Sequence, residues 1–429
     1  MNPLRSMVHN ALLGFSMEQT TGTKRRCPLL LISDAPSSSS GLGRITRELA
    51  IRIHGHLSDV CRLGVLGYGG PGSRSFGFTQ YSIEGMVDWI VPSLPEVWED
   101  FAGDEKGIVM TVWDASRLMW FSQPARCEML NGNPIFRNWL INAPFKRWGY
   151  FPIDAEGPNE KLSFPLVQTL LGFDKILAYG EWGRQVVQRS IGEEQSRIRT
   201  LDALPHGIDT NVFYERNRAQ CRQKFGSITG ARLLIHAPQL LSVMENEVLV
   251  GIVATNQPRK DWALGIQAAA LLAKERKLRL WIHTDGLERA WSIPALLADY
   301  GLLDRAMIST GFLSDDDMAQ AYSACDLTLG IGPEGWGLPL GESLACGTPV
   351  ITGSYAGGAE ITPKEMHVEP IAYRLEGLYA CVRPVFNVND WVERSIQNLD
   401  KRASLDPQYA WKNLWPRWEA WFRRNIDEQ

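Results

Sequence analysis

Two glutamates lie close together in a segment that is otherwise poor in polar side chains. The stretch EGWGLPLGESLACGTPVI covers residues 334–351, and seven residues, including three glycines and a proline, separate Glu334 from Glu342. Glycines let the backbone approach a ligand, the free amides at a helix start favour an anion, and carboxylates accept hydrogen bonds from sugar hydroxyls. These residue types therefore indicate a ligand with hydroxyl-rich rings around a phosphate.

Two basic residues, Arg259 and Lys260, are a second candidate for chemistry. They follow an apolar run and precede a helical pattern, and positive charge at a helix start is unfavourable unless an anion binds there. A simpler interpretation makes them exposed helix-start residues. Asp114 and Asp154 also follow apolar runs, and each either binds a hydroxyl of a ligand or caps its own loop.

These residues need elements to hold them, and short apolar runs alternate with helical patterns along the chain. Such alternation predicts an α/β fold with two doubly wound, Rossmann-like domains that face each other across a cleft, where ligands bind beyond the carboxyl ends of the strands. The predicted strands are 27–33, 60–67, 107–113, 147–153, 175–180, 247–254, 278–284, 306–310, 327–331 and 349–352. The predicted helices include 44–54, 181–191, 261–275, 314–324 and one from Pro339 to Gly347.

The chain is expected to divide into four parts. Residues 1–26 form a loose leader, 27–225 and 226–405 two Rossmann-like domains, and 406–429 a closing helix. With 429 residues and a net charge of −4, nothing favours nucleic acid as a partner. No apolar window approaches the length of a membrane span. Seven scattered cysteines without a CxxC pair indicate reduced thiols in a cytoplasmic protein, and no metal site.

Four stretches in order resemble the retaining glycosyltransferases of the GT-B fold, the large group 1 family with its E-x7-E segment. They are LPHGIDTNVF (204–213), NQPRKDWALGIQAAALL (256–272), STGFLSDDDMAQAYSACDLTL (309–329) and the opening segment, 334–351. The resemblance is strong over residues 204–358 and faint in the first domain. It implies the GT-B fold, in which the first domain (27–225) binds the acceptor and the second (226–405) the nucleotide sugar, with a C-terminal helix (406–429) that crosses back onto the first domain.

The resemblance also implies roles for single residues. Glu342 is expected to hold the ribose hydroxyls of the nucleotide, and Glu334 the hydroxyls of the transferred sugar. Either could instead be a solvated loop or helix-start acid. Asp114 and Asp154 are expected to bind the acceptor. The other donor-binding positions are Gly335, Trp336, Gly337, Leu338, Pro339, Gly41, Gly43 and Phe312.

In this family a lysine and an arginine neutralise the leaving diphosphate, which removes the need for a metal. Lys260 matches the lysine, but the arginine would fall at Ala254 or Thr255, and neither is basic. Arg259 is the expected substitute. The expected catalytic residues are therefore Lys260, Arg259 and Glu334.

The resemblance implies a retaining hexosyltransferase. A UDP- or GDP-linked sugar would be the donor, and a glycan, lipid-linked or small-molecule acceptor would receive the hexose, as in polysaccharide biosynthesis, without metal or cofactor and with at most peripheral membrane contact. One alternative is a GT-B-fold epimerase. The other is a non-catalytic GT-B module that binds carbohydrate or protein, and the absent arginine favours this second alternative. A two-carboxylate glycosidase would leave the phosphate features unused.

Aromatic and histidine residues complete the candidates. Tryptophans and Phe422 recur at helical spacing in YAWKNLWPRWEAWF (409–422), which predicts either a closing helix or, with Arg417, Arg423 and Arg424, a membrane-surface helix. Near the cleft, Trp113, Trp120 and Trp336 are candidates for stacking on sugar rings. His206 is interpreted as a structural loop residue. His283 and Asp285 are expected near the base.

Overall fold

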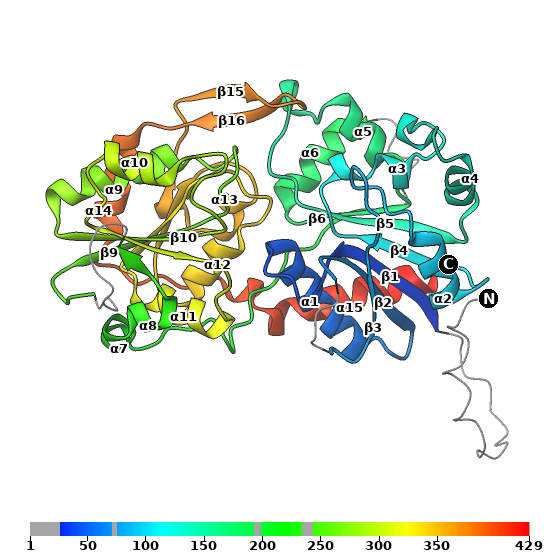
Figure 1. Ribbon diagram of the computed structural model, residues 1–429, viewed down its shortest axis with the longest axis horizontal. Helices are drawn as coiled ribbons and strands as arrows, with labels where there is room; N and C mark the ends of the chain where they lie inside the picture. The colour runs from blue at the N-terminus through cyan, green and yellow to red at the C-terminus, as the bar shows by residue number, and fades with distance from the viewer. Residues whose placement is uncertain (1–25, 71–74, 193–197, 199, 234–242, 429) are drawn as a thin grey trace, which may run out of the picture.

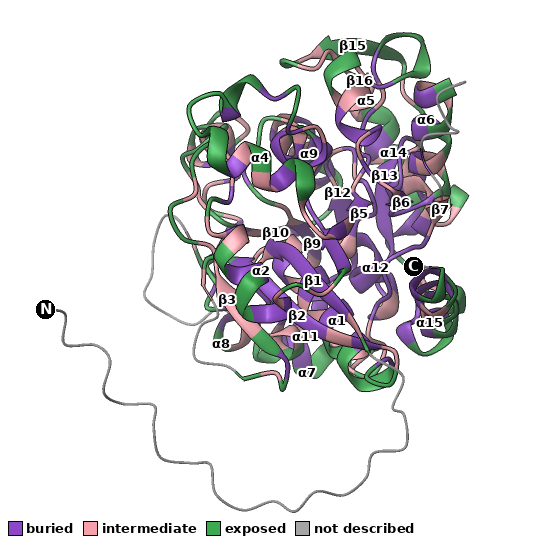
Figure 2. Ribbon diagram, turned by 90° about the vertical axis from the view of Figure 1, so that its right-hand side faces the viewer, coloured by how far each residue is buried: buried purple, intermediate pink, exposed green. Residues whose placement is uncertain are grey.

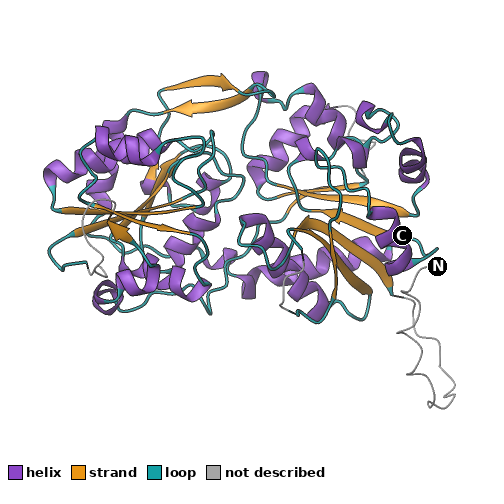
Figure 3. Ribbon diagram, viewed as in Figure 1, coloured by secondary structure: helices purple, strands orange, loops and turns teal. Residues whose placement is uncertain are grey.

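The computed structural model of the protein describes residues 26–70, 75–192, 198, 200–233 and 243–428. The predicted leader, except for Arg26, lies outside the described residues. Two α/β domains lie side by side (Figures 1 and 3), as the alternating pattern predicts.

The first domain is built on a parallel seven-stranded sheet. Its strands, in the order β3-β2-β1-β4-β5-β6-β7, are β1 (Cys27–Asp34), β2 (Cys61–Tyr68), β3 (Thr79–Ser82), β4 (Gly107–Thr111), β5 (Phe145–Phe151), β6 (Lys175–Ala178) and β7 (Thr200–Ala203). Its helices are α1 (Gly41–His56), α2 (Leu94–Ala102), α3 (Met119–Ser122), α4 (Pro134–Asn142), α5 (Phe164–Leu170) and α6 (Glu181–Ile191), with single 3₁₀ turns η1 (Ala115–Arg117), η2 (Glu128–Leu130) and η3 (Pro158–Glu160).

The second domain repeats this plan with the order β14-β13-β12-β9-β10-β11-β8, in which only β8 is antiparallel to its neighbour. Its strands are β8 (Arg232–Leu233), β9 (Val248–Val253), β10 (Leu278–Thr284), β11 (Ala306–Thr310), β12 (Leu327–Gly330), β13 (Val350–Gly353) and β14 (His367–Val368). Its helices are α7 (Arg218–Gln223), α8 (Phe225–Thr229), α9 (Trp262–Glu275), α10 (Ile293–Asp299), α11 (Asp315–Ala324), α12 (Leu338–Ala345), α13 (Gly358–Ile361) and α14 (Val388–Asn398), with a 3₁₀ turn η5 (Lys364–Met366).

The central strands are buried on both faces, which explains why they read as unbroken apolar runs rather than as alternating patterns. In β1, the four residues Leu29 to Ile32 are fully buried, and in β9 so are Leu249 and Val250. Figure 2 shows the strands of both sheets as the buried interior of the molecule. The edge strands β3 and β7 and a separate hairpin, β15 (Ala372–Glu376) and β16 (Cys381–Val385), are more exposed, and the apolar pattern did not predict them.

The domain boundary is better placed earlier than the sequence suggests. Arg222 in α7 donates to the carbonyl of Ala324 and pairs with Asp326, both at the end of α11. Helix α8 contacts α11 as well. These contacts favour a boundary before α7 rather than after residue 225.

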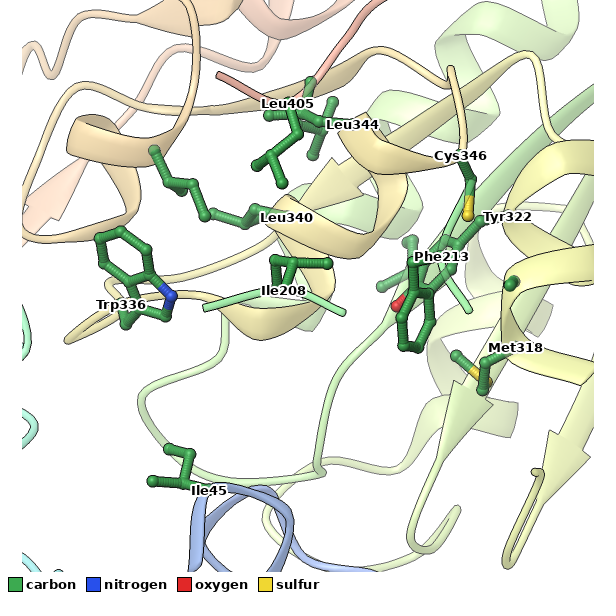
Figure 4. Packing of buried hydrophobic residues seen from close by; sticks show 14 of the residues in the cluster. Ile45, Ile208, Phe213, Met318, Tyr322, Trp336, Leu340, Leu344, Cys346 and Leu405 are labelled. Carbon is green, nitrogen blue, oxygen red and sulfur yellow. The ribbon is translucent and has the colours of Figure 1, made fainter. Parts of the chain in front are cut away.

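Two segments of chain cross between the domains, and they are bonded to each other. The amide of Ile208 donates to the carbonyl of Tyr409, and the amide of Trp411 donates to the carbonyl of Ile208. Tyr409 belongs to the 3₁₀ turn η6 (Pro407–Tyr409), which precedes the last helix. Figure 4 shows the side chain of Ile208 beside Leu340 of α12, so the crossing segments also pack against the second domain.

The tryptophan-rich segment forms the closing helix α15 (Trp411–Asp427), which runs under the first domain beside α1 (Figure 1). Its tryptophans are buried: Trp418 donates to the carbonyl of Pro205, and Trp421 lies edge-on to Trp148 of β5. Because the aromatic face is packed inside the protein, the membrane-surface interpretation is wrong. No described helix is long and apolar enough to span a bilayer.

Trp418→Ala should lower the free energy of unfolding by about 3–5 kcal/mol, because it removes a fully buried indole and leaves a cavity between α15 and Tyr150. Urea denaturation followed by circular dichroism measures this change. The exposed neighbour Arg417, changed to Ala, is the control and should cost little. A loss below 1 kcal/mol for Trp418→Ala would show that the helix does not anchor the first domain.

Candidate functional site

The loop between β12 and α12 carries Glu334, and α12 itself carries Glu342. Gly337 caps the helix with φ +97°, a backbone region that side-chain-bearing residues rarely adopt. Pro339 lies in the first turn, and the helix ends at Ala345, followed by Gly347 at φ +81°. The predicted placement of this helix, and of the two glutamates relative to it, is confirmed.

Glu334 is held by two cations of its own domain. Its carboxylate contacts the Lys260 ammonium and lies 3.6 Å from Nη1 of Arg259. Although burial works to raise the pKa of Glu334, the charges of Lys260 and Arg259 lower it below its usual value. Glu334 is therefore a carboxylate at neutral pH.

The loop before α9 positions both cations. Arg259 donates to the carbonyl of Pro333 at 2.9 Å, which ties it to the Glu334 loop. Buried Asn256 fastens the start of the same loop: its amide group donates to the carbonyls of Gly286 and Trp291. Burial and the charge of Arg259 lower the pKa of Lys260 to about 8, although Glu334 opposes this shift.

The first domain adds acids to this cluster. Asp154, which follows β5, pairs with Arg259 at 3.3 Å across the domain boundary. Asp114, which follows β4, pairs with Arg117 at 3.5 Å. Burial raises the pKa of Asp114, although the charges of Arg117 and Arg259 oppose this shift. The structure thus brings together residues that the sequence places up to 220 positions apart, from Asp114 to Glu334.

Glu342 lies in a second interdomain cluster. Its carboxylate is 3% exposed and contacts the guanidinium of Arg44, which α1 of the first domain presents. Arg44 also pairs with Asp315 at 2.5 Å, and Arg47 pairs with Asp315 at 3.0 Å. Burial raises the pKa of Glu342, although the charge of Arg44 opposes the shift.

Sequence reasoning missed Arg44 and Asp315. The available signal was position: Arg44 follows Gly41 and Gly43, and the structure places it in the first turn of α1. Its pairing with an acid about 300 residues away is a tertiary contact that no local pattern encodes.

Residues 247–375 match the family model described as glycosyl transferases group 1. The second domain of the chain is thus similar to this family. The chain is also 27% identical over 237 residues to a D-inositol 3-phosphate glycosyltransferase of Thermobispora bispora, which is 46% of this chain and 51% of that protein. The chain spans about half or less of the length of the curated relatives it matches.

The fold of the chain is similar to that of several solved structures. A sucrose-phosphate synthase from Thermosynechococcus elongatus superposes with a TM-score of 0.67 at 14% identity, covering 94% of this chain and 100% of that one. Anabaena Alr3699/HepE, in complex with UDP and glucose, superposes with a TM-score of 0.62 at 14% identity and the same coverage. These similarities and the two facing domains confirm the GT-B fold.

Two of the donor positions expected from the family have clear structural roles of their own. A Cβ on Gly335 would lie 2.8 Å from Cα of Pro152, so this glycine lets the two domains approach. A Cβ on Gly43 would lie 2.7 Å from Cβ of Ser38, so Gly43 allows the turn before α1 to pack. Gly41 has open space around it at the first residue of α1. Leu338 and Pro339 are partly exposed in the first turn of α12.

The three tryptophan candidates are buried. Trp336 is 2% exposed with its ring 4.9 Å from that of Tyr409, and Trp113 and Trp120 are buried in the core of the first domain. The prediction that these three rings stack on a sugar is therefore wrong, because each ring is enclosed by protein. Phe312, after β11, is 67% exposed and keeps its place as a candidate.

The histidines behave as structural or peripheral groups. His206 is buried against Trp411, and burial lowers its pKa well below its usual value. His283 bonds to the Ser309 hydroxyl, and burial lowers its pKa to about 4. Asp285 accepts from the amide of Asn256. Among the residues that the structure describes, no group of three or more His, Cys, Asp and Glu side chains could hold a metal ion.

Arg44→Met should open the domains. Leaving Glu342 unpaired in its buried position would cost about 3–5 kcal/mol, whereas opening the domains hydrates it. Small-angle scattering should show a larger radius of gyration than for the wild type. Arg305→Ala, whose ion pair with Asp304 lies within the second domain, is the control. An unchanged radius for Arg44→Met would mean that other contacts hold the domains together.

Proposed function

We propose that the chain is a retaining hexosyltransferase that moves a hexose from a nucleoside diphosphate sugar to an acceptor hydroxyl. The observation that carries this proposal is the cluster of Lys260 and Arg259 around Glu334, joined across the boundary by Asp154. It offers fixed cations for a diphosphate and carboxylates for hydroxyls at one place between two domains. The family and the GT-B fold agree with this chemistry.

The donor would replace contacts that the side chains now make with each other. Lys260 and Arg259 would exchange Glu334 for the diphosphate, and Glu334 would accept from sugar hydroxyls instead. In the same way Glu342 would exchange Arg44 for the ribose hydroxyls. Glu334 and Glu342 would each keep hydrogen-bond donors, and Arg44 would keep its ion pair with Asp315, which matters because an unpaired buried charge is costly.

In the proposed reaction, the bond between the anomeric carbon and the phosphate oxygen breaks as the acceptor oxygen attacks from the same face. The acceptor proton passes to the departing phosphate oxygen. Negative charge grows on the diphosphate, and cations already in place stabilise that charge without reorganisation. Asp154 and Asp114, on the first domain, are proposed to orient the acceptor hydroxyl.

A similar solved structure suggests which donor to test first. Anabaena Alr3699/HepE was solved with UDP and glucose, which favours a UDP-linked hexose as the first donor to test. A thermal-shift screen of UDP- and GDP-sugars, followed by measurement of nucleotide release with and without acceptors, tests the function itself. A protein that binds donors but never releases nucleotide would be a binding module, which the absent arginine at Ala254 and Thr255 favours.

The two glutamates should have different effects. Glu342→Ala should weaken binding of the free nucleoside diphosphate as well as the donor, because ribose is common to both. Glu334→Ala should leave the free nucleotide bound and impair sugar transfer. Calorimetric titration of both variants with nucleotide measures the difference, and equal losses would contradict the assigned roles.

Lys260→Ala and Arg259→Ala should each reduce turnover by one to two powers of ten, since a charge-assisted contact to phosphate contributes about 1.5–3 kcal/mol. Steady-state kinetics of both variants measures this. If Arg259→Ala is silent while Lys260→Ala is not, Arg259 does not replace the missing arginine.

The charge on Lys260 should also set the alkaline limit of activity. The pKa of Lys260 is lowered to about 8. Its side chain is therefore charged below that pH and loses its proton as the pH rises through that value. The wild-type kcat/KM, which reports the free enzyme, should therefore fall above pH 8. Lys260→Arg, which does not titrate in this range, should flatten the decline. A wild-type profile that stays level to pH 9.5 would contradict this.

Activity should survive EDTA, because the proposal assigns charge neutralisation to side chains. The assay is nucleotide release after dialysis against the chelator, with and without added Mg²⁺ or Mn²⁺. A strict requirement for either ion would refute the role given to Lys260 and Arg259.

A further inference from the structure

The β15–β16 hairpin bridges the two domains beside the site (Figure 1). The amide of Val382 donates to the carbonyl of Glu156 in the first domain at 2.7 Å, and the Tyr355 hydroxyl donates to the carbonyl of Val382. The match to the family model ends at residue 375, inside β15. Strand β16 therefore lies outside the part of the chain that the family model covers.

Arg383 in β16 has donors without acceptors. Its side chain is 12% exposed, and Nε and Nη1 are buried without a hydrogen-bond partner. The nearest carboxylates are those of Asp154 at 3.7 Å and Glu376 at 3.9 Å, which are ion-pair distances too long for hydrogen bonds. Buried guanidinium donors normally find acceptors, so Nε and Nη1 of Arg383 are available to donate to an acceptor atom of a ligand.

The same arginine lines a cavity together with Arg259 and Arg374. Arg374 and Arg383 are directly opposite each other in the hairpin ladder, an arrangement in which like charges destabilise the pairing. Of the two acids in the lining, Asp261 accepts from the amide of Leu264 as the cap of α9. Glu376 is the other, and it pairs with both hairpin arginines. An anion in the cavity would offset this crowding of positive charge.

The cavity is also tied to the reacting centre. Asp154 pairs through one oxygen with Arg259 and through the other with Arg383, and Arg259 in turn pairs with Glu334. A molecule whose hydroxyl lies at Asp154 could therefore extend a charged substituent towards Arg383.

We infer that Arg383 and Arg374 form an anion subsite for the acceptor, which would be a sugar that carries a phosphate or a carboxylate. The inference rests on the proposed function, because it takes Asp154 as the place of the acceptor hydroxyl. The planar fork of an arginine suits both anionic groups. The hairpin is then a specificity element: it recognises the charge on the acceptor, while the residues of the family segments handle the donor.

Three hexose probes that differ in charge test the inference by calorimetric titration of the full chain: glucose, glucose 6-phosphate and glucuronate. The wild type should bind at least one of the two anionic sugars tenfold or more tightly than glucose, the effect expected of one charge-assisted contact. The sugar that binds more tightly than glucose identifies the anionic group.

Arg383→Ala should abolish the preference. Arg383→Lys, which keeps the charge and loses the fork, should retain part of it, and this variant guards against a misfolded hairpin. Arg305→Ala and Lys260→Ala should both keep the preference.

Three results would overturn the inference: no preference in the wild type, an unchanged preference in Arg383→Ala, or loss of the preference in Lys260→Ala, which would place the anion at the diphosphate site. The function proposed above is judged separately, by nucleotide release from the donor. If the wild type turns over a donor and Arg383→Ala does not alter discrimination between the probes, the transferase stands and the subsite fails. If no donor is turned over, retention of the Arg383-dependent preference still supports the subsite.

Discussion

A carboxylate that is withdrawn from water needs a cation beside it, and this requirement organises the space between the two domains. Glu334 and Glu342 are both held by basic side chains, Glu334 by Lys260 and Arg259 and Glu342 by Arg44. Only one of these cations comes from the first domain, and it reaches the acid that is the more deeply buried. Removing the first domain would thus leave Glu342 without its charge partner, so some of the contacts that join the domains also build the site.

This arrangement follows from the topology. Parallel sheets place their loops at the carboxyl ends of the strands, and the loops after β4, β5, β9 and β12 carry Asp114, Asp154, Arg259 and Glu334. Turning two such edges towards each other concentrates charged loops between them. The glycine at 335 then matters for its lack of a side chain, because it allows the second domain to approach Pro152 closely. A larger residue there would hold Asp154 away from Arg259.

The sequence predicted the parts of this design that are encoded locally. Buried parallel strands appear as continuous apolar runs, and the α12 helix is marked by Pro339 and by glycines on both sides, so these elements were foreseeable. The exposed edge strands β3 and β7 and the β15–β16 hairpin have no such pattern, because they are not buried on two faces. The partners of the glutamates were only half predictable. Lys260 lies in a recognisable stretch, whereas Arg44 and Arg383 reach the site through tertiary contacts alone. Trp113, Trp120 and Trp336 were wrongly predicted to contact a sugar. Proximity to a predicted cleft does not show which way a side chain points.

The paired crossing segments have a mechanical consequence. Ile208 and Ala410 belong to two chain segments that run side by side and share hydrogen bonds. A single strand between two bodies permits swivelling in any direction. Two hydrogen-bonded segments resist torsion and resist sliding past each other. They can still bend in the direction perpendicular to the plane that contains both. The paired segments would therefore allow the domains to bend about one axis more readily than to twist. Because bending about one axis is reversed along the same path, residues of the two domains that separate on opening would meet the same partners again on closing.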